Sequence, residues 1–350
     1  MHKKIKLMII TFIFFIFNIT LPCSHVKAST EFVTRISGDN RYETSAKVAT
    51  TNWTTSHNVV LVSSEGYADA VSASALAKKL DAPILLTSSD ILSSETQTAL
   101  ETLKPSNIYI VGGTSSISQI IRDGLKAKYT LIELSGLNRY ETNLAVAKEL
   151  VKLGVGASNV MVVGGEGFAD ALSVAPIAAA KGQILLLANN NQSSMQPVIN
   201  FVKDNKSTVT IVGTCEVISD SIKDAFGTNA TRVNGGADRF DTNLKVLMAF
   251  NSDLKNDKLY IANASPSTPD NMYADALAAS VLAGKYTAPI ILVDKDGSAA
   301  TTNSIRCIQD IASKNTYVYI IGGNEVVTDN MFHTIENIIT MIFHVYIHKE

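Results

Sequence analysis

Short runs of apolar, largely β-branched residues alternate along the chain with longer stretches that mix apolar and polar residues. In the first third of the chain the runs are NVVLVS, PILLTS and NIYIVGG. The stretches between them, such as YADAVSASALAKKL, are amphipathic or alanine-rich and span about 10–14 residues. The short runs predict buried strands and the longer stretches predict helices. This alternation predicts parallel strands joined by right-handed crossovers, with helices on both faces of each sheet.

The pattern is written three times. The opening segment SGDNRYET, 37–44, recurs as SGLNRYET at 135–142 and GGADRFDT at 235–242. Three further segments keep their order in every copy: YADAV, FADAL and YADAL; APILL, GQILL and APIIL; IVGG, IVGT and IIGG. Such a repeat predicts an α/β chain of three tandem, small, parallel-sheet (Rossmann-like) modules. The expected boundaries are 31–128, 129–227 and 228–340, followed by a short tail, 341–350, read either as a packed strand or as the remnant of something longer.

The N-terminus has the pattern of a secretory signal. A basic start and a run of Ile, Phe and Leu precede small residues at the cleavage positions, so we expect residues 1–28 to be removed after Ala28. An uncleaved anchor and a lipoprotein signal at Cys23 are alternatives, and Pro22 fits the second poorly. Removal takes away four lysines and no acid, which changes the formal charge from −2 to −6.

The mature composition narrows the function. A mildly acidic chain without a basic block argues against nucleic acid as a partner. No later apolar run reaches the roughly 20 residues that span a bilayer, so no membrane contact is expected after cleavage. Cys215 and Cys307 occupy unrelated positions of the repeat, which excludes a repeated disulfide framework. There is no CxxC, HExxH or His-rich tract, so the sequence indicates no metal site and no cofactor.

The opening segment has a structural explanation for most of its residues. Asn40 and Glu43 have the spacing of a capping box at the start of a helix, and the preceding Gly38 suits a turn. The corresponding pairs are Asn138 with Glu141 and Asp238 with Asp241, after Gly136 and Gly236. Capping does not explain three arginines of these segments, Arg41, Arg139 and Arg239. Each either bridges to a neighbouring carboxylate or contacts a ligand or another module.

A repeated acid raises the question of catalysis. Asp69, Asp170 and Asp275 each follow a predicted strand, where open α/β sheets bind ligands, but an acid in a helix's first turn is also favoured by the helix dipole. No second repeated acid–base partner accompanies them, no histidine holds a repeated position, and neither G-x-G-x-x-G nor G-x-S-x-G occurs. We therefore expect a protein that is not an enzyme. A wall-associated hydrolase using these acids and a secreted solute-binding protein are the rivals.

These segments resemble the cell wall binding repeat 2 family of Gram-positive surface and S-layer proteins. The resemblance is carried by R-[IV]-x-G-x-[ND]-R-[YF]-[ED]-T, [YF]-A-D-A-[LV]-[SA], A-P-I-L-L and I-[VI]-G-G. It implies three modules in a pseudo-threefold arrangement that hold a secreted protein non-covalently on an anionic secondary polysaccharide of the wall. It also implies a place at the cell surface, with other S-layer proteins as further candidate partners. We expect three weak sites to act multivalently, and no separate effector domain.

The candidate polymer-binding residues follow from this resemblance and from the charge. Arginine pairs bidentately with phosphate or carboxylate, and the family's Ile-Leu-Leu segment is implicated in anchoring. A buried strand would carry the same apolar residues, so a role in the fold alone remains open for that segment. The candidates are Arg41, Arg139, Arg239, Arg35 and Arg232, with Ile84, Leu85 and Leu86 in the first copy, Ile184, Leu185 and Leu186 in the second, and Ile290, Ile291 and Leu292 in the third.

Overall fold

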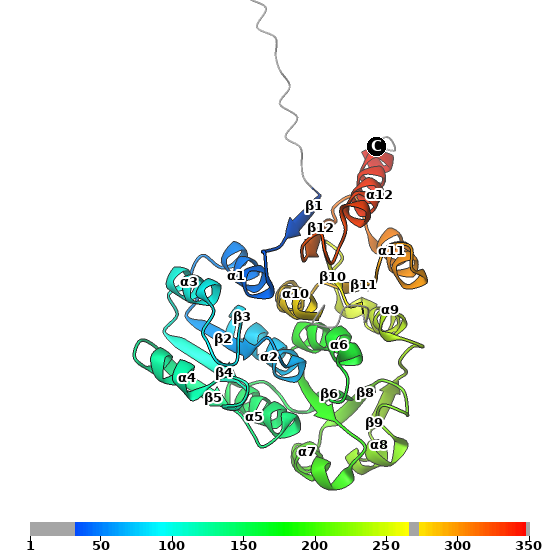
Figure 1. Cartoon of the computed structure of the whole chain (residues 1–350). Coiled ribbons are helices and arrows are strands. Elements are labelled where there is room, and N and C mark those ends of the chain that lie inside the picture. Colours follow the sequence, from blue (N-terminus) through cyan, green and yellow to red (C-terminus); the bar gives the residue numbers. More distant parts are fainter. Residues whose placement is uncertain (1–31, 266–272, 348–350) are drawn as a thin grey trace, which may run out of the picture. The chain divides into compact units, whose positions relative to one another are not determined.

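The computed structural model describes residues 32–265 and 273–347 of the 350-residue chain. The predicted signal segment, 1–28, lies outside the described residues. In the described part, helices alternate with parallel strands that form three sheets of four strands each (Figure 1). The predicted fold class, α/β with three small parallel-sheet modules, is confirmed.

The three sheets share one strand order. Sheet 1 has the order β3-β2-β4-β5, sheet 2 β7-β6-β8-β9, and sheet 3 β11-β10-β12-β1. Their bounds are β2 Asn58–Ser63, β3 Ile84–Thr87, β4 Asn107–Val111 and β5 Thr130–Leu134; β6 Asn159–Gly164, β7 Ile184–Ala188, β8 Thr208–Val212 and β9 Ala230–Val233; β10 Lys258–Asn263, β11 Ile290–Val293, β12 Tyr317–Ile321 and β1 Val33–Ile36. The second strand of each order is buried at all but its first residue, as expected of a central strand with both faces covered.

Each sheet takes three strands from one copy of the repeat and its fourth from another. β5 begins the second copy yet pairs with β4 of the first, and β9 begins the third copy yet pairs with β8 of the second. β1, at the start of the first copy, pairs with β12 of the third, with Val33 opposite Val318. The sequence repeat and the sheets are thus out of phase by one strand, and these pairings link the three sheets in a closed cycle.

The helices fall into four equivalent sets. The set that follows the opening segments comprises α1 Arg41–Asn52, α5 Arg139–Lys152 and α9 Arg239–Ala249. The others are α2 Tyr67–Leu80, α6 Phe168–Lys181 and α10 Tyr273–Tyr286; α3 Ser94–Leu103, α7 Gln192–Asp204 and α11 Ala299–Ile311; α4 Gln119–Lys126, α8 Asp220–Phe226 and α12 Asp329–Ile347; a 3₁₀ turn, η1, spans Asn251–Asp253.

Helices α2, α6 and α10 pack on one another between the sheets (Figure 1). They are rich in small residues, which let their backbones approach closely. A Cβ added at Gly284 would lie 2.8 Å from the Cβ of Ala179, and the hydroxyls of Ser74 and Ser280 are 3.1 Å apart. Each helix of this trio contacts the other two, which is the expected pseudo-threefold arrangement.

The C-terminal segment is helical. Residues 340–347 extend α12 rather than forming a strand, so the strand reading of the tail is wrong. Met331, Ile335 and Ile339 recur at four-residue spacing and are buried, which is the spacing of one helix face. The Phe343 ring lies 4.5 Å from the Phe32 ring, centroid to centroid, and holds the helix against the start of β1.

Candidate functional site

The repeated opening segment connects two sheets. β1 lies in sheet 3, whereas α1, which follows it, packs against β3 of sheet 1. In the same way β5 of sheet 1 leads to α5 on sheet 2, and β9 of sheet 2 leads to α9 on sheet 3. Segments 37–44, 135–142 and 235–242 are therefore the crossings between sheets, and we call them the junction segments.

The predicted capping pairs form at every junction. Asn40 Oδ1 accepts the backbone N–H of Glu43 at 2.9 Å, while Glu43 Oε2 accepts the N–H of Asp39 at 2.6 Å. The acid thus reaches the residue before the cap, not the cap residue of a standard capping box. The hydrogen bond from Asp39 lowers the pKa of Glu43. The pairs Asn138 with Glu141 and Asp238 with Asp241 repeat both contacts.

Glycine and threonine close the same turn. Thr44 Oγ1 accepts the N–H of Gly38 at 3.0 Å, and a Cβ on Gly38 would overlap the Cβ of Glu43. The glycine is needed for this close approach and not for a positive φ. Junctions two and three repeat the contact between Thr142 and Gly136 and between Thr242 and Gly236.

The junction arginines end on equivalent backbone carbonyls. Arg41 Nη1 donates to Ser64 O (3.4 Å), Arg139 Nη1 to Gly165 O (2.7 Å) and Arg239 Nη1 to Ala264 O (3.1 Å). Each of these carbonyls lies just beyond the second strand of a sheet. Arg139 Nη1 also donates to the Tyr67 hydroxyl at 2.7 Å, and its guanidinium lies 5.5 Å from the centre of that ring. Because Tyr67 begins α2, this arginine bridges the first and second copies. Arg139 is exposed, and Arg41 and Arg239 are half-buried.

The repeated acids lie in the first turns of α2, α6 and α10. Burial raises the pKa of Asp69, whereas the Ser116 hydroxyl at 2.9 Å and the charge of Arg139 oppose the rise. Burial raises the pKa of Asp170 as well, against a hydrogen bond from Thr242. For Asp275, burial raises the pKa to about 6, against the charge of Arg41. Each carboxyl therefore interacts with the junction segment of the following copy.

The loop glycines that face these acids admit no side chain. Gly112, Gly213 and Gly322 have φ between +119° and +125°, and a Cβ on each would collide with Oδ2 of the facing aspartate. Glycoside hydrolysis generally uses two carboxyl groups roughly 5 to 10 Å apart. Asp69 and Asp170 instead accept hydrogen bonds from the hydroxyls of Ser116 and Thr242. Asp275 interacts with the charge of Arg41, in a crevice that Asp39 and Glu325 also line.

A crevice of about 220 Å³ opens where the third copy meets the first. The junction segment supplies Asp39, Asn40 and Arg41, and the third copy supplies Asp275 and Glu325. Donors and acceptors therefore stand side by side in one concave site, which is how polar ligands are oriented.

Arg35 and Arg232 bind the protein's own backbone. Arg35 donates to Gly322 O at 3.0 Å and Val327 O at 2.7 Å, and Arg232 donates to the equivalent Gly213 O at 2.9 Å and Ile218 O at 2.7 Å. Each also pairs with an acid, Arg35 with Asp329 and Arg232 with Asp220.

In sheet 1 the corresponding guanidinium comes from a helix and not from a strand. Glu133 of β5 holds the position of Arg35 and pairs with Arg122 of α4, whose guanidinium donates to Gly112 O and Ile117 O. One loop thus receives a guanidinium in all three modules, from a strand twice and from a helix once. Arg122 was not among the predicted site residues, although Glu133, at the position that is Arg35 and Arg232 in the other copies, was a readable signal.

The Ile-Leu-Leu segments are buried edge strands. Every one of their predicted contact residues is at most 4% exposed. Asn143 of α5 donates to Leu185 O and accepts from Leu187 N, so the backbone edge is covered as well. Ser45 makes the same two contacts with Ile84 O and Leu86 N in the first copy. Asn243 makes them with Ile290 O and Leu292 N in the third.

The register corrects the alignment of the second copy. Ile84 lies opposite Val60, and Leu185 lies opposite Met161, which holds the place of Val60 in β6. The equivalent triplet in the second copy is therefore Leu185–Leu187, one residue later than the pattern of Ile184, Leu185 and Leu186 indicates. All of these residues are apolar, so composition alone does not set the register.

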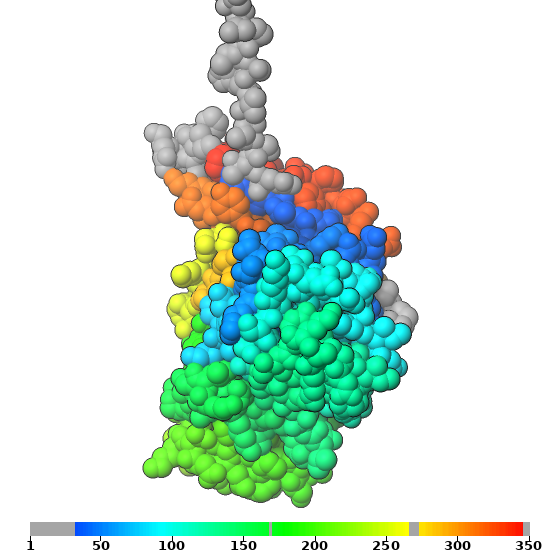
Figure 2. Space-filling model, turned by 90° about the vertical axis from the view of Figure 1, so that its left-hand side faces the viewer, coloured from blue at the N-terminus to red at the C-terminus, as the bar shows by residue number. Residues whose placement is uncertain are grey.

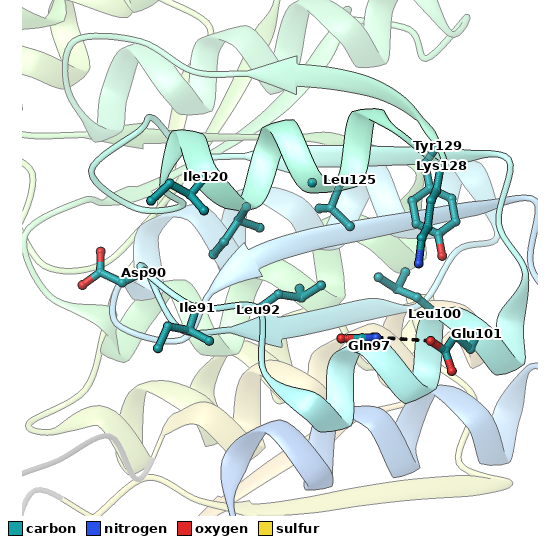
Figure 3. Close-up of a pocket in the computed structure, with 12 residues that line it drawn as sticks. Asp90, Ile91, Leu92, Gln97, Leu100, Glu101, Ile120, Leu125, Lys128 and Tyr129 are labelled. Carbon is teal, nitrogen blue, oxygen red and sulfur yellow. Dashed lines mark hydrogen bonds between the residues drawn. The ribbon is translucent and has the colours of Figure 1, made fainter.

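An apolar groove on the first copy was not predicted from the sequence. It has a volume of about 420 Å³ and lies between α3 and α4, with Ile91 72% and Ile120 81% exposed at its rim (Figure 3). Leu92, Leu100 and Leu125 line the groove. Segment 90–130 is cyan in the space-filling view of this side of the molecule (Figure 2).

None of the helices in residues 32–265 and 273–347 combines the length and hydrophobicity of a membrane span. Two solved structures are similar to the chain. Cwp8 from Clostridium difficile has a TM-score of 0.77 and 27% identity, covering 89% of this chain and 52% of that one. Cwp6 from Clostridium difficile has a TM-score of 0.75 and 28% identity, covering 88% and 48%.

Two Bacillus subtilis (strain 168) proteins are similar in sequence. The chain is 31% identical over 305 residues to an amidase enhancer, covering 87% of this chain and 39% of that protein. It is 32% identical over 295 residues to the N-acetylmuramoyl-L-alanine amidase LytC, covering 83% and 55%. The chain thus spans about two fifths of the length of the amidase enhancer and about half of the length of LytC.

The profile of one family, described as cell wall binding domain 2 (CWB2), matches the chain three times, at residues 35–122, 133–223 and 233–332. Together these matches cover most of the chain, and each begins within or just after the first strand of a copy. The chain belongs to the cell wall binding domain 2 family and is a cell-wall-associated surface protein.

Proposed function

We propose that the protein anchors itself to the wall by binding an anionic secondary polysaccharide non-covalently at its three junctions. The observation that carries this proposal is a recurring arrangement: each junction arginine donates to the carbonyl just beyond a central strand. At Arg41 and Arg139 the guanidinium also interacts electrostatically with the aspartate of the preceding copy. Sugar hydroxyls both donate and accept hydrogen bonds, so a guanidinium and a carboxyl side by side suit them. The crevice at Arg41 and Asp275 shows this pairing in a concave site.

The other sequence candidates act through the fold in this proposal. Arg35 and Arg232 are held by carbonyls and acids, and the Ile-Leu-Leu segments are covered on their faces and at their edge. Arg41, Arg139 and Arg239 remain as the candidate contacts. Their guanidinium groups keep some exposure and recur at the same place in each copy.

Three sites on one body would act together. A repeating polymer presents the same unit many times, so the second and third contacts form at a high effective concentration. Weak contacts at single junctions then add up to firm anchoring. Contacts with other S-layer proteins are a separate prediction.

We further propose that these modules bind and do not catalyse. The family to which the chain belongs is a binding module. The name of one relative, LytC, describes an amidase, but the match spans 55% of that protein. The comparisons favour neither the wall hydrolase nor the solute-binding protein.

The direct test is sedimentation of the mature protein with purified Gram-positive walls, before and after chemical removal of their secondary polymer. We expect binding to intact walls and loss of most of it from stripped walls. Equal binding to both would contradict the polymer as ligand, and release of soluble sugar or peptide from the walls would contradict a purely binding role.

A single substitution tests the junctions. Arg139→Gln removes the one exposed junction guanidinium, and we expect wall binding to weaken roughly three- to tenfold because one of three contacts is impaired. Arg306→Gln is the matched control, since Arg306 is exposed on α11 and contacts only Asn303 among the described hydrogen bonds. Equal binding by both variants would remove the second junction from the site.

A further inference from the structure

The opposite ends of the three central helices carry a group of lysines. Lys78 and Lys79 lie in the last turn of α2, Lys181 in that of α6 and Lys285 in that of α10. Lys78 Nζ donates to Lys285 O at 2.7 Å, and Lys78, Lys79 and Lys181 border one cavity. The helix ends are therefore adjacent, and we call these four residues the lysine cluster.

Two cavities flank Lys78. One, of about 330 Å³, lies between α2 and α10 and is bordered by Lys285, Trp53 and Tyr286, and by Asp81, which pairs with Lys285. The other, of about 350 Å³, lies between α2 and α6 and is bordered by Lys79 and Lys181, with Leu150 and Val155 as an apolar wall. Lys78 borders both cavities, so one ammonium group can serve two neighbouring ligand groups.

The cluster holds more positive than negative charge. Among the described residues its ion pairs are Lys285 with Asp81, at 2.5 Å, and Lys181 with Asp253, at 2.6 Å. Lys78 and Lys79 form no such pair within the described part of the chain. Burial lowers the pKa of Lys78, and the charges of Lys285 and Lys255 lower it further, against Asp81.

Helix ends alone do not account for this arrangement. A lysine in the last turn is stabilised by the helix dipole, but that effect needs no cavity and is satisfied at the surface. Here the aliphatic stems stand in concave sites, and Lys285 Nζ lies 4.2 Å from the centre of the Trp53 ring, which orients it. Crowded like charges become favourable when an anion binds between them.

The junction crevice differs in its charge. Arg41 is accompanied there by Asp39, Asp275 and Glu325, so an anion would meet three acids. A protein with a net negative charge needs a local excess of cations to hold a polyanion, and the lysine cluster supplies one.

We propose that the lysine cluster is a second polymer contact, which takes anionic groups, phosphate or carboxylate, in the two cavities on either side of Lys78. This inference rests on the proposed function and adds a charge-binding site to the sugar-binding junctions. Each cavity offers ammonium donors to oxygen atoms and an apolar wall to the ring that carries them.

The test compares two triple variants with the same loss of charge. The cluster variant is Lys78→Gln, Lys79→Gln and Lys181→Gln. The control is Lys128→Gln, Lys203→Gln and Lys295→Gln, whose lysines are exposed and lie outside the cluster. Binding to purified walls is measured from about 0.05 M to 1 M NaCl, over which the Debye length falls from more than 10 Å to about 3 Å.

We expect the cluster variant to bind walls about tenfold more weakly at low salt and to lose most of its salt dependence, while the control follows the wild type. Equal binding by wild type and cluster variant at every salt concentration would overturn the inference and leave the proposed function intact. Lys78→Arg keeps the charge and should retain binding, which separates a lost ligand contact from a lost fold if the triple variant unfolds.

A soluble probe separates this site from the proposed function. Inorganic polyphosphate is titrated into the wild type and both variants. If the wild type fails to bind walls, the proposed function falls, yet binding of polyphosphate that disappears in the cluster variant still supports the anion site. If the wild type binds neither, or the cluster variant binds polyphosphate as well as the wild type, the site is excluded. Walls freed of phosphodiesters then distinguish phosphate from carboxylate as the natural group.

Discussion

The two ends of the central helices use positive charge in different ways. At the junction end, the arginines donate to backbone carbonyls, and Arg41 and Arg139 interact electrostatically with the aspartates of the preceding copy. At the other end, Lys78 and Lys79 border open cavities and form no ion pair with the described residues. The guanidinium fork satisfies several acceptors in a fixed geometry, whereas a lysine keeps a mobile point charge. Charge at the first end therefore stabilises the contacts between copies in addition to its proposed contact with sugars, whereas charge at the second end is available for an anionic ligand.

The largest effect should come from cutting the chain at a repeat boundary. Fragment 31–128 lacks β5, which completes sheet 1, and retains β1, whose partner β12 is absent. We expect it to unfold or aggregate, because both sheet edges then expose unpaired backbone. Circular dichroism and a urea titration provide the measurement. Cooperative unfolding of this fragment would show that the junctions do not hold the copies together.

Deleting core volume next to a junction should rank second. Leu85 is fully buried in β3 beneath α1, so Leu85→Ala should lower the free energy of unfolding by about 2–5 kcal/mol. Ile91→Ala is the control, since Ile91 is 72% exposed and its loss should cost within about 0.5 kcal/mol. Wall binding by the Leu85 variant should fall only where the protein unfolds. A folded variant that no longer binds would restore a direct role for the segment.

The two kinds of charge can be compared directly. Arg139→Ala removes two charged hydrogen bonds, to Gly165 O and to the Tyr67 hydroxyl, so it should destabilise the fold by about 1–3 kcal/mol. The hydrogen bond from the Tyr67 hydroxyl to Gly165 O remains. Lys79→Ala, at an exposed position, should change stability by less than about 0.5 kcal/mol. Urea unfolding of both variants decides the point. A larger loss from Lys79 than from Arg139 would reverse the assignment of the two ends.

A pH dependence is expected at the junction end. The pKa of Asp275 is raised to about 6, so the folded state binds its proton more tightly than the unfolded chain does. Stability of the wild type relative to Asp275→Asn should therefore fall as pH rises from about 4 to about 6, by about 2 kcal/mol. The lowered pKa values of Glu43 and Asp241 act in the opposite direction but cancel in this difference. Parallel stability curves for the two proteins would show that the carboxyl is not perturbed.

Local features of the fold were predictable from short segments. The strands NVVLVS and NIYIVGG and the helix YADAVSASALAKKL lie where the apolar pattern placed them. The capping pair Asn40 and Glu43 formed because it depends on residues three apart in one turn. The trio of central helices was expected from the family resemblance, not from the pattern itself.

Features that depend on distant residues were not predictable in the same way. The predicted triplet of the second copy lies one residue before the observed one. Ile184 and Leu187 are equally apolar, and only the pairing with β6 decides which of them belongs to the triplet. Arg35 was predicted to contact the polymer, but its guanidinium donates to Gly322 O, 287 residues away in sequence. The lysine cluster was not predictable from the repeat, because only Lys79 and Lys285 hold the same position of the helix, and Lys78 and Lys181 lie one residue before and one after it.

The sequence by itself determined that the chain is three copies of one α/β unit, where most strands and helices lie, and which family it resembles, since each of these follows from local periodicity and repetition. Only the tertiary structure decided that each copy lends its first strand to another copy's sheet, which arginines bind the backbone, and where lysines from three helices meet around cavities. Strand pairing, burial and the meeting of charges depend on contacts between residues that lie well apart in the sequence, from Asn107 opposite Thr130 to Val33 opposite Val318. No short segment records which of several similar partners it will meet.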